Sequence, residues 1–152
     1  MLNIGDLAPD FELLDAEEKS VKLSDFRGQR VVLFFYPKAG TSGCTTQACG
    51  FRDNYPKIEA AKGTVVGVSP DQPAALAKWI AAENLPFTLL SDPDHQVAAA
   101  YGVWGEKKMY GNTYMGIIRS HFVVDAAGNI EDVQFKVSPK NSISLAMATL
   151  VD

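Results

Sequence analysis

The sequence has no apolar run that approaches the roughly 20 residues of a membrane-spanning helix. Residues 2–6 also lack the basic and apolar regions of a signal peptide. Positive charge is scarce, and the formal net charge is -4 at pH 7. Sequence-independent binding to nucleic acid or to anionic lipid needs basic patches. We therefore expect a cytoplasmic protein that binds neither nucleic acid nor membranes.

Metal-binding and cofactor-binding residues are also few, because the chain contains two cysteines and two histidines. A zinc site built from Cys44, Cys49, His95 and His121 is disfavoured, since cysteine ligand pairs normally lie two to four residues apart. No glycine-rich phosphate loop is present. We expect no metal, haem, flavin or nicotinamide cofactor.

The two cysteines themselves favour redox chemistry. Disulfides in a reducing compartment are usually transient and catalytic rather than structural. The alternative, which the pair alone leaves open, is that both are buried thiols that act as small hydrophobic side chains.

The order of apolar runs predicts alternating strands and helices in one domain spanning residues 1–152. We expect a hairpin at 11–14 and 21–23, buried strands at 30–36, 64–68 and 87–90, and a second hairpin at 117–125 and 130–137. Helices are expected at 44–54 with a break at Pro56, after Asp71 through Ile80, at 95–101 with an Asp94 cap, and from 139 or 140 to 150. Residues 107–113 are expected to form a mobile loop.

The central feature is the stretch 37–53, where a buried strand leads into a loop and then into a helix. Both cysteines lie near the start of that helix. Unpaired N–H groups and the positive end of the helix dipole favour an anion there. A thiol at a helix N-terminus is therefore a better thiolate, and hence a better nucleophile, than an ordinary cysteine.

This stretch resembles the peroxiredoxins, because Pro37, Thr41 and Cys44 have the spacing of the family signature. A second cysteine five residues later, Cys49, is similar to the peroxiredoxin Q group, also called the bacterioferritin comigratory protein group. Segments 5–11, 90–95 and 101–107, and Arg119 at a late strand, extend the resemblance along nearly the whole chain. It implies a thioredoxin-like fold, with a central mixed sheet flanked by helices and an N-terminal β-hairpin extension.

The resemblance also implies roles for individual residues. Cys44 would attack the peroxide, and Cys49 would resolve the sulfenic acid as an intramolecular disulfide. Thr41 and Arg119 would assist Cys44, and Pro37 and Gly43 would line the substrate pocket.

Each residue also has a purely structural interpretation. The Thr41 hydroxyl could cap the helix by accepting the N–H of residue 43 or 44. Arg119 could be an edge residue that extends to solvent. His121 departs from the family pattern, and we favour a core histidine with a satisfied hydrogen bond over a second charge near the site. We expect Arg27, Arg30 and Arg52 to be surface charges.

The implied activity is reduction of hydrogen peroxide and small organic hydroperoxides by a monomer, with thioredoxin or a glutaredoxin-like protein as reductant. One alternative is a protein thiol-disulfide oxidoreductase on the same fold, although that activity predicts a C-x-x-C pair. Another is a non-catalytic chaperone or binding module, which would tolerate the loss of Thr41 or Arg119. Cys44 and Cys49 cannot bond within one helix, so we also expect residues 44–54 to unfold locally on oxidation.

Overall fold

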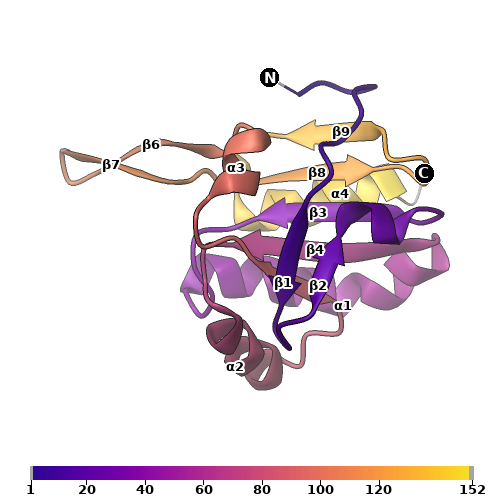
Figure 1. The fold of residues 1–152 in the computed structure, drawn as a ribbon, viewed down its shortest axis with the longest axis horizontal. Coiled ribbons are helices and arrows are strands. Elements are labelled where there is room, and N and C mark those ends of the chain that lie inside the picture. Colours follow the sequence, from indigo (N-terminus) through magenta and orange to yellow (C-terminus); the bar gives the residue numbers. More distant parts are fainter. Residues whose placement is uncertain (1, 151–152) are drawn as a thin grey trace.

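The structure, a computed structural model that describes residues 2–150, is built on a seven-stranded mixed sheet (Figure 1). The strand order is β2-β1-β5-β4-β3-β8-β9. Strands β3, β4 and β5 are parallel, and the remaining pairs are antiparallel. The bounds are β1 Glu12–Asp15, β2 Ser20–Lys22, β3 Arg30–Phe35, β4 Gly63–Ser69, β5 Thr88–Ser91, β8 Ser120–Val124 and β9 Ile130–Gln134.

The central strand β3 separates two hydrophobic cores, because side chains alternate between the faces of a strand. Val31, Leu33 and Phe35 belong to one core. Val32, Phe34 and the following Tyr36 belong to the other, together with Cys44. The run of apolar residues in β3 therefore reflects burial on both faces, as the sequence predicts.

Helices cover both faces of the sheet. Figure 1 shows α1 Ser42–Ala60 and α4 Pro139–Leu150 behind the sheet and α3 Gln96–Ala100 in front of it. Helix α2 Pro73–Glu83 packs its Leu76 and Trp79 into the same core as α1. A 3-10 helix, Leu23–Phe26, follows the N-terminal hairpin. Among residues 2–150, no helix is both long enough and apolar enough to cross a membrane.

The prediction of a mobile loop at 107–113 is wrong. Strands β6 Trp104–Met109 and β7 Asn112–Ile117 form a separate antiparallel hairpin, which projects to the left in Figure 1. Tyr110 and Gly111 at its tip both have positive φ, which is the turn geometry that suits a two-residue hairpin loop. The expected strand 117–125 is consequently divided, and Arg119 lies in the short segment between β7 and β8.

Helix α1 also differs from the prediction, because it continues through Pro56 to Ala60. Tertiary packing outweighs the missing N–H of the proline, since Ile58 is fully buried and Tyr55 is hydrogen-bonded to Thr64 at 3.0 Å. The two expected aspartate caps are wrong in detail. Gln72 is the N-cap residue of α2, and the backbone N–H groups of Val97 and Ala98 in α3 donate to Asp92 rather than to Asp94.

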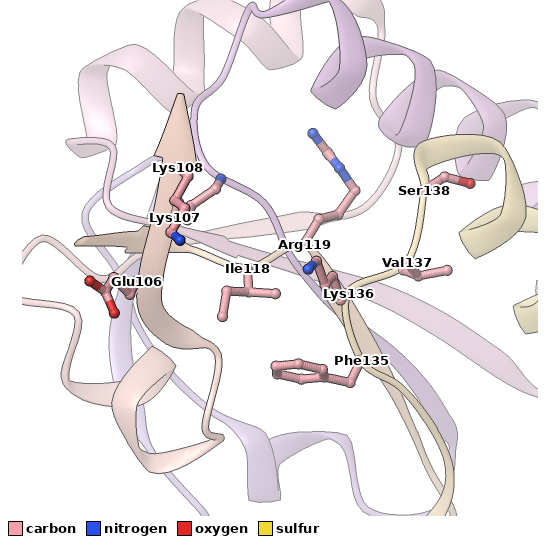
Figure 2. A pocket seen from close by; sticks show the side chains of 9 residues that line it. All are labelled: Glu106, Lys107, Lys108, Ile118, Arg119, Phe135, Lys136, Val137 and Ser138. Atoms are coloured by element: carbon pink, nitrogen blue, oxygen red, sulfur yellow. The ribbon is translucent and has the colours of Figure 1, made fainter. Parts of the chain in front are cut away.

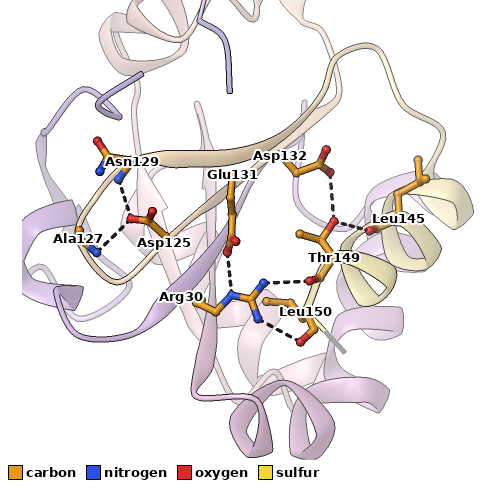
Figure 3. Close-up of polar contacts among 9 residues, drawn as sticks. All are labelled: Arg30, Asp125, Ala127, Asn129, Glu131, Asp132, Leu145, Thr149 and Leu150. Atoms are coloured by element: carbon orange, nitrogen blue, oxygen red, sulfur yellow. Dashed lines mark hydrogen bonds and ion pairs between the residues drawn. The ribbon is translucent and has the colours of Figure 1, made fainter. Parts of the chain in front are cut away.

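The prediction that Arg30 is a surface charge is also wrong (Figure 3). Its guanidinium donates to Glu131 at 2.7 Å and to the carbonyls of Thr149 and Leu150 at 2.9 and 3.1 Å. The last carbonyls of a helix have no partner within it, so this arginine both satisfies the end of α4 and ties it to the sheet.

Candidate active site

Cys44 lies in the first turn of α1 and is 1% exposed. The loop that precedes it is held to the end of β4 by Asp71, whose carboxylate accepts the N–H of Ala39 at 2.8 Å and the hydroxyl of Ser69 at 2.7 Å. These hydrogen bonds tie the loop before α1 to the sheet. The N–H groups of the first turn have no helical acceptor, so they form an environment that favours the thiolate of Cys44.

Arg119 reaches Cys44 from the segment between β7 and β8. Its Nη2 lies 3.5 Å from Cys44 Sγ. Gly43 permits this approach, because a methyl group at Gly43 would lie 3.1 Å from the same Nη2 atom. The structure thus brings together Cys44, Gly43 and Arg119, and the prediction that Arg119 is more than an edge residue agrees with this geometry. A guanidinium remains charged at all relevant pH values.

Gln47 is a site residue that the sequence analysis did not identify. It is fully buried, and its Oε1 accepts a hydrogen bond from Arg119 Nη1 at 2.7 Å. Its side-chain nitrogen donates to Ser142 on α4 at 2.9 Å. Gln47 follows Cys44 by three residues, so the two share one face of the helix. That spacing, together with the rarity of fully buried glutamine, is the signal that could have identified it.

Thr41 occupies the N-cap position of α1, but its hydroxyl does not cap the helix. The hydroxyl instead donates to the carbonyl of Lys38 at 2.8 Å and stabilises the loop before the helix. The purely structural alternative, in which the hydroxyl accepts the N–H of residue 43 or 44, is therefore wrong. Thr41 is exposed, and Pro37 is half-buried two residues after the end of β3.

Cys49 lies in the same helix but faces a different partner. Its thiol donates to Glu83 Oε2 on α2 at 3.6 Å, and Arg52 donates to the backbone carbonyl of Glu83 at 2.7 Å. Burial raises the pKa of the Cys49 thiol, with Glu83 adding to the rise and Arg52 opposing it. Arg52 therefore links α1 to α2, contrary to the prediction that it is only a surface charge. Both cysteines are free thiols.

A cavity of about 740 Å³ lies beside Arg119 (Figure 2). Figure 2 shows the guanidinium of Arg119 directed away from Phe135. Lys107 lies on the hairpin side of the cavity, and burial and the nearby Arg119 lower its pKa against the opposing effect of Cys44. The lining combines apolar side chains with four cations, one carboxylate and one hydroxyl. Its residues are Glu106, Lys107, Lys108, Ile118, Arg119, Phe135, Lys136, Val137 and Ser138.

Metal-binding side chains do not gather at this site. Within residues 2–150, no group of three or more His, Cys, Asp or Glu side chains could hold a metal ion. The chemistry that the described side chains support is that of a thiolate beside a guanidinium.

Known proteins are similar to this chain in sequence and in fold. The AhpC/TSA family pattern matches residues 4–133. A putative peroxiredoxin from Haemophilus influenzae is 54% identical over 138 residues, which cover 90% of this chain and 89% of the relative. A peroxiredoxin, Bcp, from Escherichia coli strain K12 is 51% identical over 146 residues, covering 95% and 94%.

Solved structures are also similar to this chain. A bacterioferritin comigratory protein from Xanthomonas campestris, studied for its alkyl peroxide reduction activity, is 29% identical with a TM-score of 0.89, covering 99% of this chain and 96% of that one. This similarity agrees with the predicted thioredoxin-like fold, in which β1 and β2 form the N-terminal hairpin. The chain therefore belongs to the AhpC/TSA family, among the peroxiredoxins of the bacterioferritin comigratory protein group.

Proposed function

We propose that Cys44 is the residue with which this thiol-dependent peroxidase attacks its substrate. The observation that carries the proposal is the distance of 3.5 Å between Arg119 Nη2 and Cys44 Sγ at the first turn of α1. The thiolate attacks one peroxide oxygen, and the O–O bond breaks. The other oxygen leaves as water or an alcohol once it is protonated, and Cys44 becomes a sulfenic acid. Arg119 and the first-turn N–H groups stabilise the negative charge that develops on oxygen.

The substrates that we propose are hydrogen peroxide and small organic hydroperoxides. The cavity beside Arg119 supports the organic substrates, because Ile118, Phe135 and Val137 in its lining offer contacts to an alkyl group. We assign Gly43 and Pro37 to the pocket next to Cys44. We also propose that Thr41, the N-cap residue of α1, assists Cys44 in the reaction with the peroxide.

Cys49 is proposed as the resolving residue. Its thiol attacks the sulfur of the Cys44 sulfenic acid, water leaves, and a disulfide forms. Five residues of helix separate the two Cα atoms by about 7.5 Å along the axis and by about 140° around it. A disulfide needs Cα atoms roughly 4.4 to 6.8 Å apart, so α1 has to unwind locally.

Amide hydrogen exchange tests this step. The oxidised protein is expected to lose protection at residues 44–54, while β3, β4 and β8 remain protected in both states. Equal protection of residues 44–54 in reduced and oxidised protein would show that Cys49 does not resolve Cys44 by local unfolding.

We further propose that thioredoxin or a glutaredoxin-like protein reduces the disulfide by thiol exchange, and that the enzyme acts as a monomeric single domain in the cytoplasm. A dithiol donor would attack a sulfur of the Cys44–Cys49 disulfide that we propose and would return both residues to thiols. A donor-dependent peroxidase assay with several hydroperoxides tests the reductant and the substrate range. Cys44→Ser is expected to abolish peroxide consumption. Protein disulfide exchange without peroxide consumption would favour the thiol-disulfide oxidoreductase alternative instead.

Selective alkylation tests the assignment of the two cysteines. At mildly acidic pH, Cys44 is expected to react before Cys49, because Cys44 faces a guanidinium and Cys49 faces a carboxylate. Equal labelling of both residues at pH 6 would contradict the assignment.

A further inference from the structure

Four side chains connect the active site to the interior of the sheet through buried hydrogen bonds. Arg119 Nη1 donates to Gln47 Oε1 at 2.7 Å, and Gln47 Nε2 donates to Ser142 Oγ at 2.9 Å. Ser142 Oγ lies 2.7 Å from His121 Nδ1. Gln47, Ser142 and His121 are all 0% exposed, and they come from three different elements, α1, α4 and β8.

The direction of each proton in this chain follows from the chemistry of arginine. A guanidinium has donors only, so the oxygen of the Gln47 amide must face Arg119 and its NH2 group must face Ser142. Ser142 Oγ therefore accepts from Gln47, and its own proton is free to be donated to His121 Nδ1. A neutral His121 that accepts at Nδ1 carries its proton on Nε2.

Asp132 on β9 lies at the far end of this chain. Its Oδ2 atom is 3.8 Å from His121 Nε2, and within residues 2–150 this nitrogen has no hydrogen-bond partner. The nearby imidazole is the main reason that the pKa of Asp132 is lowered, although burial opposes the effect. Thr149 on α4 also donates to Asp132, at 3.4 Å (Figure 3). With His121 in this tautomer, all four protons point in one direction, from Arg119 toward the Asp132 carboxylate.

Two simpler interpretations do not account for this arrangement. The first is a hydrolase triad, because Asp132, His121 and Ser142 lie in the spatial order of its acid, base and nucleophile. Ser142 is fully buried, however, and its hydroxyl oxygen accepts a hydrogen bond from Gln47, so it cannot reach a substrate. A core histidine with a satisfied hydrogen bond explains Nδ1. It does not explain why the buried Nε2 faces a carboxylate.

We propose that His121 and Ser142 are positioning residues for Arg119. His121 accepts the proton of the Ser142 hydroxyl, so the oxygen of Ser142 is available to accept a hydrogen bond from the Gln47 amide nitrogen. That hydrogen bond holds the Gln47 side chain with its oxygen toward the guanidinium of Arg119. Arg119 is thereby kept at hydrogen-bond distance from Cys44. The inference rests on the proposed functions of Cys44 and Arg119.

The first test is Ser142→Ala, which interrupts the chain by removing a single oxygen atom. Ser144→Ala is the matched control, because Ser144 lies on the same helix, is exposed, and donates only to the carbonyl of Lys140. Ser142→Ala is expected to lower the second-order rate constant for peroxide by about three- to tenfold. It should also lower the thiolate fraction of Cys44 at pH 6, measured by alkylation, and Ser144→Ala should change neither.

Variants of His121 separate a positioning role from a purely structural one. His121→Leu removes the acceptor for Ser142 and is expected to reproduce Ser142→Ala. In His121→Asn the side-chain oxygen takes the approximate place of Nδ1, so this variant is expected to recover most of the rate and of the thiolate fraction. Urea denaturation of each variant measures stability separately from these two readouts.

The outcomes are distinct. If Ser142→Ala and His121→Leu match Ser144→Ala in rate and in thiolate fraction, the proposal is wrong and the buried chain only stabilises the fold. If the two variants lose rate and thiolate fraction and His121→Asn recovers them, the proposal is supported. If the unmodified protein does not reduce peroxide, the proposed function of Cys44 fails, and the thiolate fraction still decides the role of His121 and Ser142.

Discussion

The two cysteines of α1 belong to the same helix but differ in the side chain that contacts each thiol. Cys44 is buried in the first turn with the guanidinium of Arg119 at 3.5 Å. Cys49 is half-buried in the second turn with the carboxylate of Glu83 at 3.6 Å. A cation stabilises a thiolate and an anion stabilises a thiol. The neighbouring elements therefore supply a different partner to each thiol, and the difference agrees with the roles that we propose for Cys44 and Cys49.

The largest expected effect comes from removing the cation on the Cys44 side. Arg119→Met is expected to lower the rate constant for peroxide by about a hundredfold, the usual order for the loss of a preorganised donor to a developing negative charge. Stopped-flow kinetics of the reduced protein measures this. Arg52→Met removes the arginine on the Cys49 side and is the control, with a rate expected near that of the unmodified protein. Similar losses of the rate constant in Arg119→Met and Arg52→Met would contradict the expectation that only the arginine beside Cys44 takes part in peroxide reduction.

A smaller effect is expected from Gly43→Ala, which perturbs the same side without removing charge. The added methyl would lie 3.1 Å from Arg119 Nη2 and displace the guanidinium. A rate loss of about tenfold is expected, because small displacements of a catalytic group are costly. Ser42→Ala, at the neighbouring exposed position, should leave the rate unchanged. A Gly43→Ala enzyme with the normal rate would show that the close approach of Arg119 is not required.

On the Cys49 side, Glu83→Gln is expected to have a more modest effect. Because the Glu83 carboxylate contributes to the raised pKa of Cys49, the substitution should lower that pKa and move Cys49 alkylation to lower pH. Mass spectrometry of alkylated protein across a pH series measures the change, with Glu59→Gln, at an exposed position of α1, as control. An unchanged alkylation profile would exclude Glu83 as a determinant of Cys49 reactivity.

The smallest expected effect concerns stability rather than chemistry. The pKa of Asp132 is lowered mainly by His121, so its charged form stabilises the fold above the unfolded carboxyl pKa of about 3.9, and this stabilisation is lost as pH falls through the lowered value. Asp132→Asn is expected to lower the free energy of unfolding by about 1 kcal/mol at pH 7.

Urea denaturation at pH 7 and at pH 3 measures this difference, which should be smaller at pH 3. Asp53→Asn is the control on the Cys49 side, since the Arg52–Asp53 ion pair lies at the surface and such pairs contribute little. An equal loss in both variants, or a loss in Asp132→Asn that persists unchanged at pH 3, would contradict the assigned role of the buried histidine.

The sequence was sufficient for the large elements and for the two residues that meet at the reaction centre. Strand β3 is a continuous apolar run after its first residue, helix α4 begins at a proline near the end of the chain, and Cys44 and Arg119 belong to the motifs that resemble the family. The hairpin of β6 and β7 was missed because most of its side chains are exposed, so no core pattern identifies it.

Side-chain partners from distant segments were the least predictable. Gln47 is interpretable only once α4 supplies Ser142, and Glu83 only once α2 packs beside Cys49. The structural alternative for Thr41, a helix cap, does not occur because its hydroxyl donates to the carbonyl of Lys38 within the same loop. Local chemistry lists what each side chain can donate or accept, but the fold determines which partner it finds.

Pro56, near the C-terminal end of α1, has a consequence for how far the helix can unwind. Proline has no N–H to offer the carbonyl of Arg52, so the ladder of hydrogen bonds along α1 is already interrupted at that point. On either side of Pro56, the hydrogen bond between Tyr55 and Thr64 and the buried side chain of Ile58 fasten the end of the helix to the sheet. We expect Pro56 to act as a boundary to melting, so that the turns carrying both thiols open and close as a unit while the remainder of α1 stays in register.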